Sequence, residues 1–205
     1  MTSGPLGVGV LAAVFAVLPA AVSAQSPSRN VELGGHVSVL RLSEFDVTDT
    51  GVGMTAAWRA TPIIALDSSL SWFPGSDGTT AGRIESQQRV LGLVGGRSGI
   101  HRGPIELFAR ARAGFLRFSP QDAVCVAVTT VPLPLECHVA SGVTSFASDI
   151  GGGVSVTTSR GLQIRIDAGD LMVRYDEKAY RSNGELSDGF TSHNVQLSSA
   201  IVWRF

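Results

Sequence analysis

Apolar residues occur at every second position through most of the chain beyond residue 30. In the segment 105–115, for example, Ile105 and Leu107 share one face, while Glu106 and Arg110 share the other. Alternation with a period of two is the pattern of a β-strand whose faces meet different surroundings. Stretches of this kind are found eight times, at residues 31–39, 51–59, 64–72, 88–96, 105–115, 146–157, 162–167 and 194–205. The pattern predicts an all-β chain.

One of these stretches has an ambiguous pattern. Within 88–96, either Val90 and Val94 or Leu91 and Leu93 can form the apolar face, because each pair keeps an even spacing. The alternation therefore predicts a strand here but leaves open which side chains face which way.

The connections between the predicted strands alternate in length. Short connections are expected at 60–62, 98–104 and 158–161, and longer ones at 43–50, 74–87, 119–143 and 176–192. In an up-and-down meander, this alternation puts the short and the long connections at opposite ends. Outer-membrane barrels have such an asymmetry, with short periplasmic turns and longer outer loops. The pattern thus predicts an eight-stranded, antiparallel, up-and-down transmembrane β-barrel.

The polar faces of the strands carry charges of both signs. These residues are Glu32, Arg59, Asp67, Glu106, Arg110, Arg112, Asp149, Arg165 and Asp167. An arginine facing lipid near the bilayer midplane costs about 2–4 kcal/mol, whereas inside a narrow barrel it can pair with a carboxylate. We therefore expect these charges in the lumen and the apolar faces toward lipid. The alternative is a soluble, lipocalin-like barrel with its apolar face turned inward around a ligand.

The N-terminus has the pattern of an export signal. Residues 5–22 contain no charge, and Val22-Ser23-Ala24 offers small residues where a signal peptidase cuts. We predict a signal peptide over 1–24, removed by cleavage, and a barrel domain over 25–205. The alternative is an uncleaved membrane anchor, for which the glycines and the proline of this segment are unfavourable.

Composition narrows the class further. Charged residues make up 16% of the chain, against about 25% in soluble proteins. Beyond the N-terminus no apolar run reaches the roughly 20 residues of a transmembrane helix. The net charge of −1 offers no basic surface for nucleic acid. Glycine-rich stretches lack the following Lys-Ser/Thr of a phosphate loop, so no cofactor is expected.

The end of the chain resembles a known group of proteins. Ile201, Trp203 and Phe205 lie on one apolar face of the last predicted strand. This strand resembles the last strand of the outer-membrane β-barrel families, whose terminal aromatic residue forms the recognition signal for barrel assembly. The segment 162–175 resembles the penultimate strand of the small porin-like barrels related to the OmpA transmembrane domain.

The resemblance implies an eight-stranded barrel in the cell outer membrane, inserted by the barrel-assembly machinery and surrounded by outer-membrane lipid. We expect it to be a monomer. Aromatic residues amount to only 7% of the chain, so the interfacial girdles are expected to be thin. The candidates for them are Trp58, Trp72, Trp203, Phe115 and Tyr175.

The two cysteines, Cys125 and Cys137, both lie in the longest connection. An exported protein reaches a compartment where disulfides persist, so we predict a disulfide between them. Such a bond stabilises by roughly 3 kcal/mol through chain entropy. Free thiols are the alternative, and a metal site has little support because only His138 is adjacent.

No residue set commits the chain to a chemistry. Some eight-stranded outer-membrane barrels are lipid A-modifying enzymes with a Ser/His pair, which draws attention to Ser192 and His193. Adjacent residues on a strand point to opposite faces, so these two are not expected to cooperate. We expect His36 and His193 to come near each other, because the first and last strands pair when the barrel closes. We therefore expect no enzyme, no catalytic residues and no metal.

The function predicted from the sequence is that of an integral barrel of structural or surface-interaction type, acting through its long outer loops, especially 119–143. A narrow small-solute porin is the first alternative. Eight-stranded barrels are, however, just wide enough for side chains to fill. A lipid-modifying enzyme and the soluble ligand binder remain as further alternatives.

Overall fold

A computed structural model describes most of the predicted barrel domain. The described residues are 30–44, 46–75, 88–120, 124–126, 136–138, 142–158, 161–176 and 189–205. The predicted signal peptide and its cleavage site lie outside them. The described part of the chain contains no helix that is long and apolar enough to span a membrane.

Eight long strands form the wall of the molecule. They are β1 (Val31–Leu42), β2 (Val47–Arg59), β3 (Ile64–Phe73), β4 (Arg89–Arg102), β5 (Ile105–Phe118), β8 (Thr144–Thr157), β9 (Leu162–Tyr175) and β10 (Phe190–Arg204). Between β5 and β8, the short strands β6 (Val124–Val126) and β7 (Glu136–His138) pair with each other as a separate hairpin.

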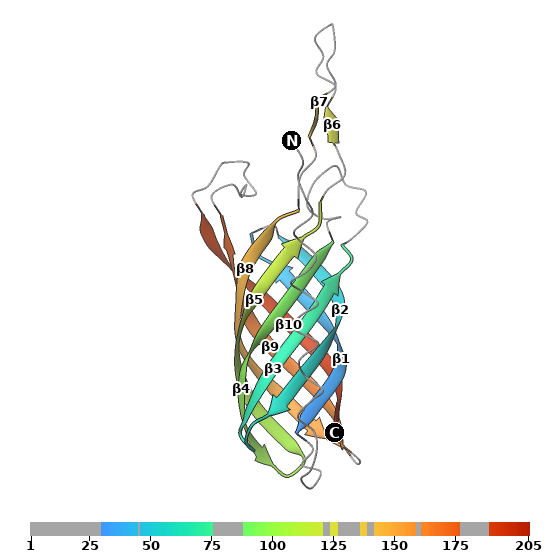
Figure 1. Cartoon of the computed structure of the whole chain (residues 1–205), viewed down its shortest axis with the longest axis vertical. Helices are drawn as coiled ribbons and strands as arrows, with labels where there is room; N and C mark the ends of the chain where they lie inside the picture. The colour runs from blue at the N-terminus through green and yellow to red at the C-terminus, as the bar shows by residue number, and fades with distance from the viewer. Residues whose placement is uncertain are drawn as a thin grey trace, which may run out of the picture.

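The eight long strands close into one antiparallel barrel (Figure 1). Each strand pairs with its neighbour along the chain, and β1 pairs with β10 to complete the ring. A closed sheet has no unpaired edge, which is the condition for a β-structure in lipid. The predicted eight-stranded, up-and-down barrel is confirmed.

Following the paired positions once around the barrel shifts the register by ten residues, from position 40 to position 30 of β1. The path runs through Leu40, Gln196, Gly169, Gly151, Arg110, Arg97, Ala65, Arg59 and Asn30. A stagger of this kind makes the strands tilt by about 35–45° to the axis. Paired residues on neighbouring strands therefore do not lie at the same height along the barrel axis. The residue at the same height is slightly more than one position away from the paired residue.

The two ends of the barrel differ in their connections. The turns β2–β3, β4–β5 and β8–β9 lie at one end, together with the C-terminus; we call it the turn end (Figure 1). The long connections β3–β4, β5–β8 and β9–β10 leave from the opposite end, the loop end, above which the β6–β7 hairpin stands. The asymmetry in connection length follows the sequence prediction.

The first connection at the loop end is shorter than predicted. The polar sequence at 43–50 predicts a loop, but β2 already begins at Val47, which leaves only residues 43–46 between the two strands. Asp46 closes this connection with a φ of 51°, a left-handed conformation that aspartate tolerates better than most residues. Thr48 and Asp49 belong to the strand, where Thr48 faces outward and Asp49 faces inward.

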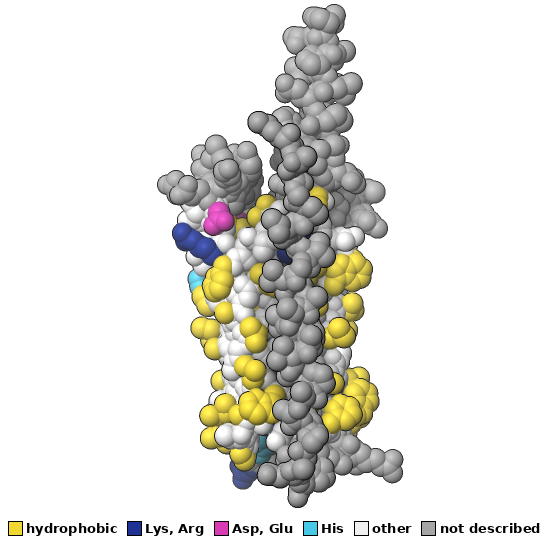
Figure 2. Space-filling view, in the orientation of Figure 1, with side chains coloured by type: hydrophobic (Ala, Val, Ile, Leu, Met, Phe, Trp, Pro, Cys, Tyr) yellow, Lys and Arg dark blue, Asp and Glu magenta, His cyan; other side chains and the backbone are white. Residues whose placement is uncertain are grey.

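The outer wall is apolar along most of its height. Large side chains that are about half exposed include Leu33, Met54, Leu66, Leu107, Phe146, Ile150, Ile166, Leu197, Ile201 and Trp203. Figure 2 shows hydrophobic side chains over the visible wall and charged side chains near its ends. Because the apolar face points out, the soluble ligand-binding alternative does not fit this structure.

The orientation of β4, which the pattern left open, is clear in the structure. Leu91 and Leu93 are buried inside the barrel, whereas Val94 is exposed on the wall. Arg89 and Arg97 therefore also point inward, because they are separated from Leu91 and Leu93 by even numbers of residues.

The predicted aromatic girdle is partly wrong. Trp58, Trp72 and Trp203 are exposed on the wall, but Tyr175 is only 4% exposed and lies inside the barrel. Phe115 is on the outer face, where its ring covers Gly92, the residue paired with it on β4. A Cβ atom on Gly92 would come within 2.7 Å of that ring. Phe115 thus packs against a glycine of the neighbouring strand, a known stabilising arrangement in sheets.

Candidate functional site

The lumen is filled by two layers of side chains stacked along the barrel axis. A polar layer extends from the turn end past the middle and contains Glu32, Arg59, Asp67, Arg97, Glu106, Arg110, Arg112, Asp149, Arg165 and Asp167. An apolar layer occupies the loop end and contains Leu40, Leu42, Phe73, Leu91, Leu93, Leu116, Phe118, Ala147, Leu171, Val173 and Tyr175.

The structure brings together all nine charged residues that the sequence placed in the lumen. Each is buried, with at most 8% of its surface exposed. Three further buried charges are not predicted by the sequence: Arg97 lies in the polar layer, and Asp49 and Arg89 lie among the side chains of the apolar layer. The alternation does not reveal Arg89 and Arg97, because it leaves the orientation of β4 open, and it does not reveal Asp49, because the polar segment around it predicts a loop.

Glu32 is the centre of the polar layer at the turn end. Its Oε1 accepts hydrogen bonds from Arg59 Nε at 2.6 Å and Arg204 Nη2 at 2.9 Å. Its Oε2 accepts from Arg97 Nη2 at 2.7 Å and Arg165 Nη2 at 2.8 Å. One carboxylate from β1 therefore joins arginines of β2, β4, β9 and β10 across the lumen.

A second carboxylate shares these arginines. Arg59 Nη2 donates to Glu106 Oε2 at 2.5 Å, and Arg97 Nε lies 4.0 Å from Glu106 Oε1. His101, at the turn end, is 3.3 Å from the same carboxylate and is partly exposed. The second acidic group offsets part of the positive charge gathered around Glu32.

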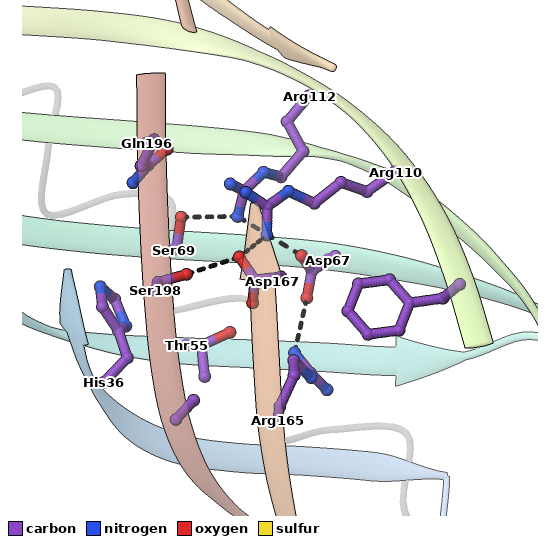
Figure 3. A pocket seen from close by; sticks show the side chains of 12 residues that line it. His36, Thr55, Asp67, Ser69, Arg110, Arg112, Arg165, Asp167, Gln196 and Ser198 are labelled. Atoms are coloured by element: carbon purple, nitrogen blue, oxygen red, sulfur yellow. Dashed lines mark hydrogen bonds and ion pairs between the residues drawn. The ribbon is translucent and has the colours of Figure 1, made fainter. Parts of the chain in front are cut away.

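The middle of the polar layer is organised around Asp149 and Asp167. Asp149 Oδ2 accepts from Arg110 Nε at 2.8 Å and from Arg112 Nε at 3.0 Å. Arg110 also pairs with Asp167, whose Oδ1 accepts from Ser198 Oγ at 2.5 Å. Arg110 and Arg112 both extend from β5 toward the carboxylates of the facing strands (Figure 3).

Asp67 joins the two parts of the polar layer. Its carboxylate lies 3.5 Å from Arg112 Nη1 on one side and 3.6 Å from Arg165 Nη1 on the other (Figure 3). Arg97 Nη1 follows at 3.9 Å. The ion pairs thus form one connected network from the turn end to the middle of the barrel.

The buried charges balance. Among the described residues, six carboxylates and six guanidinium groups are buried, and Arg204 adds a partly exposed seventh cation at the turn end. An unpaired buried charge costs several kcal/mol, while a paired and hydrogen-bonded one recovers much of that cost. The balance therefore lets a strongly charged lumen exist in a low-dielectric membrane without a compensating water channel.

The apolar layer contains one embedded ion pair, between Arg89 and Asp49, whose side chains are 0% and 2% exposed. The Arg89 guanidinium also lies 5.6 Å from the centre of the Phe118 ring. Tyr175 packs between Phe118 and Phe190, with ring centres 6.3 and 5.1 Å away. Large rings and leucines thus occupy the barrel interior where the long connections begin.

The polar layer contains a small cavity, lined in part by His36, Thr55, Ser69 and Gln196, with a volume of about 20 Å³. This is room for little more than one water molecule. His36 Nε2 is 2.8 Å from Ser71 Oγ at its edge. The cavity is too small for an organic substrate, and the described residues contain no cluster of three or more His, Cys, Asp or Glu suited to a metal.

The Ser/His pair considered from the sequence is split by the wall. The Ser192 hydroxyl is buried inside, where it donates to Asn194 Oδ1 at 3.2 Å. His193 faces outward, and its Nδ1 is 2.7 Å from Asp170 Oδ2. The two side chains therefore lie on opposite faces of β10, as expected for neighbours on a strand.

The other predicted residues lie at the two ends of the molecule. Ile201, Trp203 and Phe205 are exposed on one face at the turn end. Cys125 and Cys137 are directly opposite each other on β6 and β7. Opposite residues in an antiparallel pair are about 4.5–5.5 Å apart at Cα, which is within the disulfide range. The disulfide remains a prediction.

Comparison of the sequence with protein families and with curated proteins finds no match. Among solved structures, Neisserial surface protein A (NspA) aligns with a TM-score of 0.56 and 11% identity, over 85% of this chain and 96% of its own. The OprF N-terminal barrel of Pseudomonas aeruginosa aligns at 0.42 and 8%, over 84% and 97%. Ail of Yersinia pestis aligns at 0.42 and 8%, over 85% and 97%.

The similarity to NspA decides the fold. This chain is a small outer-membrane-type β-barrel. At 11% identity the likeness concerns the fold alone, but the wall of this molecule agrees with it independently. The outer-membrane barrel has apolar side chains facing outward and balanced charges inside, the arrangement that lipid requires.

Proposed function

We propose that this outer-membrane barrel has a structural or surface-interaction function, and that it acts through the long connections at its loop end. The observation that carries the proposal is the filling of the lumen by the polar and the apolar layer. Because side chains of the barrel fill its interior, other molecules can contact the protein only at its surface.

Conduction of solutes, the first alternative, is disfavoured by both layers. An ion crossing the polar layer has to separate hydrogen-bonded pairs such as Glu32 with Arg97, at 2.7 Å. It then meets leucine and phenylalanine side chains that offer no polar partner, such as Leu42 and Phe73, both 0% exposed. Removing a charge from water into such surroundings costs several kcal/mol.

The distribution of chain length supports action at the loop end. Three connections there leave the barrel, at residues 74–88, 119–143 and 176–189, whereas the turns at the other end are short. The β5–β8 connection carries the β6–β7 hairpin, which projects beyond the barrel (Figure 1). In outer-membrane barrels, long loops face the outside of the cell, where they meet other molecules.

The orientation is tested by short epitope tags in cells that express the protein. A tag between residues 130 and 131 is expected to bind antibody on intact cells, because the β5–β8 connection faces outward. The matched control is the same tag between residues 159 and 160, in the β8–β9 turn, which is expected to bind only after permeabilisation. If the first tag is also reached only after permeabilisation, the proposed function is wrong.

A further inference from the structure

Three strands that run toward the loop end finish with the same pattern, an outward arginine between two inward apolar residues. The three segments are Leu40-Arg41-Leu42, Leu116-Arg117-Phe118 and Val173-Arg174-Tyr175. The apolar members belong to the apolar layer, so the arginines must point away from the lumen. The fourth strand that runs toward the loop end, β3, has Trp72 instead of an arginine as its last outward residue.

The three arginines lie on neighbouring parts of the wall. The strand order β1-β10-β9-β8-β5 puts one strand between each arginine-bearing strand and the next, a lateral spacing of about 10 Å. The outward residues between them are His193 on β10 and, on β8, Thr144, which is paired with Arg117, and Phe146, which is paired with Arg174. After correction for the stagger of the strands, Arg41, Arg117 and Arg174 lie within about 4 Å of one height.

This arc, which we call the basic rim, lies at the upper boundary of the apolar wall. On β10, His193 precedes Trp203 by ten positions, and the outward residues between them are Val195, Leu197, Ser199 and Ile201. Ten residues of a tilted strand span about 24 Å along the axis, close to the apolar band of about 25 Å in outer-membrane barrels. The basic rim therefore lies at the depth of lipid headgroups.

The opposite boundary is mostly apolar. Among the described residues, Trp58, Ile100, Val156 and Trp203 are exposed near the turn end, and Arg102, at the end of β4, is the one exposed arginine there that faces outward. Three guanidinium groups at one boundary against one at the other distinguish the two leaflets, since an outward arginine is favoured only where anionic groups or water meet it.

Few acidic side chains among the described residues form ion pairs with the basic rim, so most of its positive charge is available to bind an anionic ligand. Arg41 pairs with Asp46 at 3.3 Å, both largely exposed, and Asp170 faces His193. Arg174 contacts the neutral Thr191 hydroxyl at 3.4 Å. Arg117 has no ion pair with any described residue, so it is the arginine with its full charge directed at the surroundings.

We propose that the basic rim binds the phosphate groups of lipids in the leaflet at the loop end. A guanidinium presents two parallel N–H donors to a phosphate and stays charged, which suits a site at the headgroup boundary. Three such groups spaced about 10 Å apart along the wall hold several headgroups, or one headgroup with two phosphates, against β1, β10, β9, β8 and β5. The leaflet assignment rests on the orientation proposed above.

The test uses the folded, purified barrel in octyl glucoside micelles, with lipid A as the probe. Binding is measured by native mass spectrometry for diphosphorylated lipid A and for the same lipid with both phosphates removed. The triple variant Arg41→Gln/Arg117→Gln/Arg174→Gln is expected to bind the phosphorylated lipid on the order of 100-fold more weakly than the unmodified protein, roughly fivefold per arginine. Arg102→Gln, an exposed arginine at the turn end, is the matched control and keeps full binding.

Single variants add a graded expectation. Arg117→Gln should weaken binding more than Arg41→Gln, because Arg41 already has Asp46 as a partner. The dephosphorylated lipid should bind the unmodified protein as weakly as the phosphorylated lipid binds the triple variant. Equal binding of the two lipids by the unmodified protein overturns the proposal and needs no variant to fold. Equal binding by the triple variant and the unmodified protein overturns it as well. Neither result affects the sealed lumen or the tagging experiment.

Discussion

Replacing Glu32 with glutamine is expected to lower the free energy of unfolding of the barrel by about 3–5 kcal/mol, the range for breaking a buried ion pair. The Glu32 carboxylate is 1% exposed and accepts hydrogen bonds from Arg59, Arg97, Arg165 and Arg204. An amide of the same shape removes the charge and substitutes a donor for one acceptor. The guanidinium groups then repel one another in a site that water does not reach.

The measurement is urea unfolding in lipid vesicles, followed by tryptophan fluorescence and by the shift in gel mobility between folded and unfolded barrel. Asp46→Asn is the control, because it makes the same acid-to-amide change in an exposed pair, whose side chains are 64% and 87% exposed. Exposed pairs contribute at most about 1 kcal/mol. A loss no larger for Glu32→Gln than for the control would show that the network does not hold the barrel together.

The pair of Asp49 and Arg89 should behave differently when both members are replaced. Arg89→Met or Asp49→Leu alone is expected to cost about 3–5 kcal/mol, since each leaves a charge without its main partner among apolar side chains. The double variant is expected to come within about 1 kcal/mol of the original protein, or to exceed it, because two apolar groups of similar volume fit the apolar layer.

The matching cycle in the polar layer is Arg110→Met with Asp149→Leu. Here the double variant should not recover, because Arg110 also binds Asp167 and Asp149 also binds Arg112. Both cycles are measured by urea unfolding of the four forms. If the double variant of Asp49 and Arg89 loses as much as the sum of its singles, the pair is part of a wider network and the apolar layer is not a separate unit.

The wall of the barrel was predictable from the sequence because lipid and lumen impose opposite polarity on alternate residues. On β5, Leu107 and Ala109 face out while Glu106 and Arg110 face in, as the pattern indicates. The orientation of β4 could also have been deduced. Arg89 and Arg97 are in phase with Leu91 and Leu93, so keeping arginines out of lipid selects that face as the inner one.

The apolar layer could not be predicted by the same rule, because the polarity inverts near the loop end. Leu116 and Phe118 point inward and Arg117 points outward, the reverse of the order lower on the same strand. The alternating pattern alone does not indicate at which height along the strand the outward residues stop facing lipid. For this reason the sequence predicts Tyr175 in the aromatic girdle, whereas its side chain lies inside the barrel at the loop end.

The sequence also could not predict which charged residues of the polar layer pair with each other. Glu32 and Arg165 are 133 positions apart in the chain, yet they form a hydrogen bond of 2.8 Å. Their encounter depends on the ten-residue shift of the closed barrel, which is set by the pairing of all eight strands together. The sequence indicates which charges enter the lumen, and the stagger determines which of them meet.

The most direct test of the sealed lumen is the conductance of the folded barrel in a planar lipid bilayer. Folding is verified beforehand by the gel shift on heating, and a general porin measured in the same bilayer serves as the positive control. The structure predicts no steady current steps at ordinary voltages, because the side chains of the polar layer leave a cavity of only about 20 Å³ and the apolar layer closes the loop end. Reproducible steps of uniform size from the folded protein would contradict the account and restore the pore as its function.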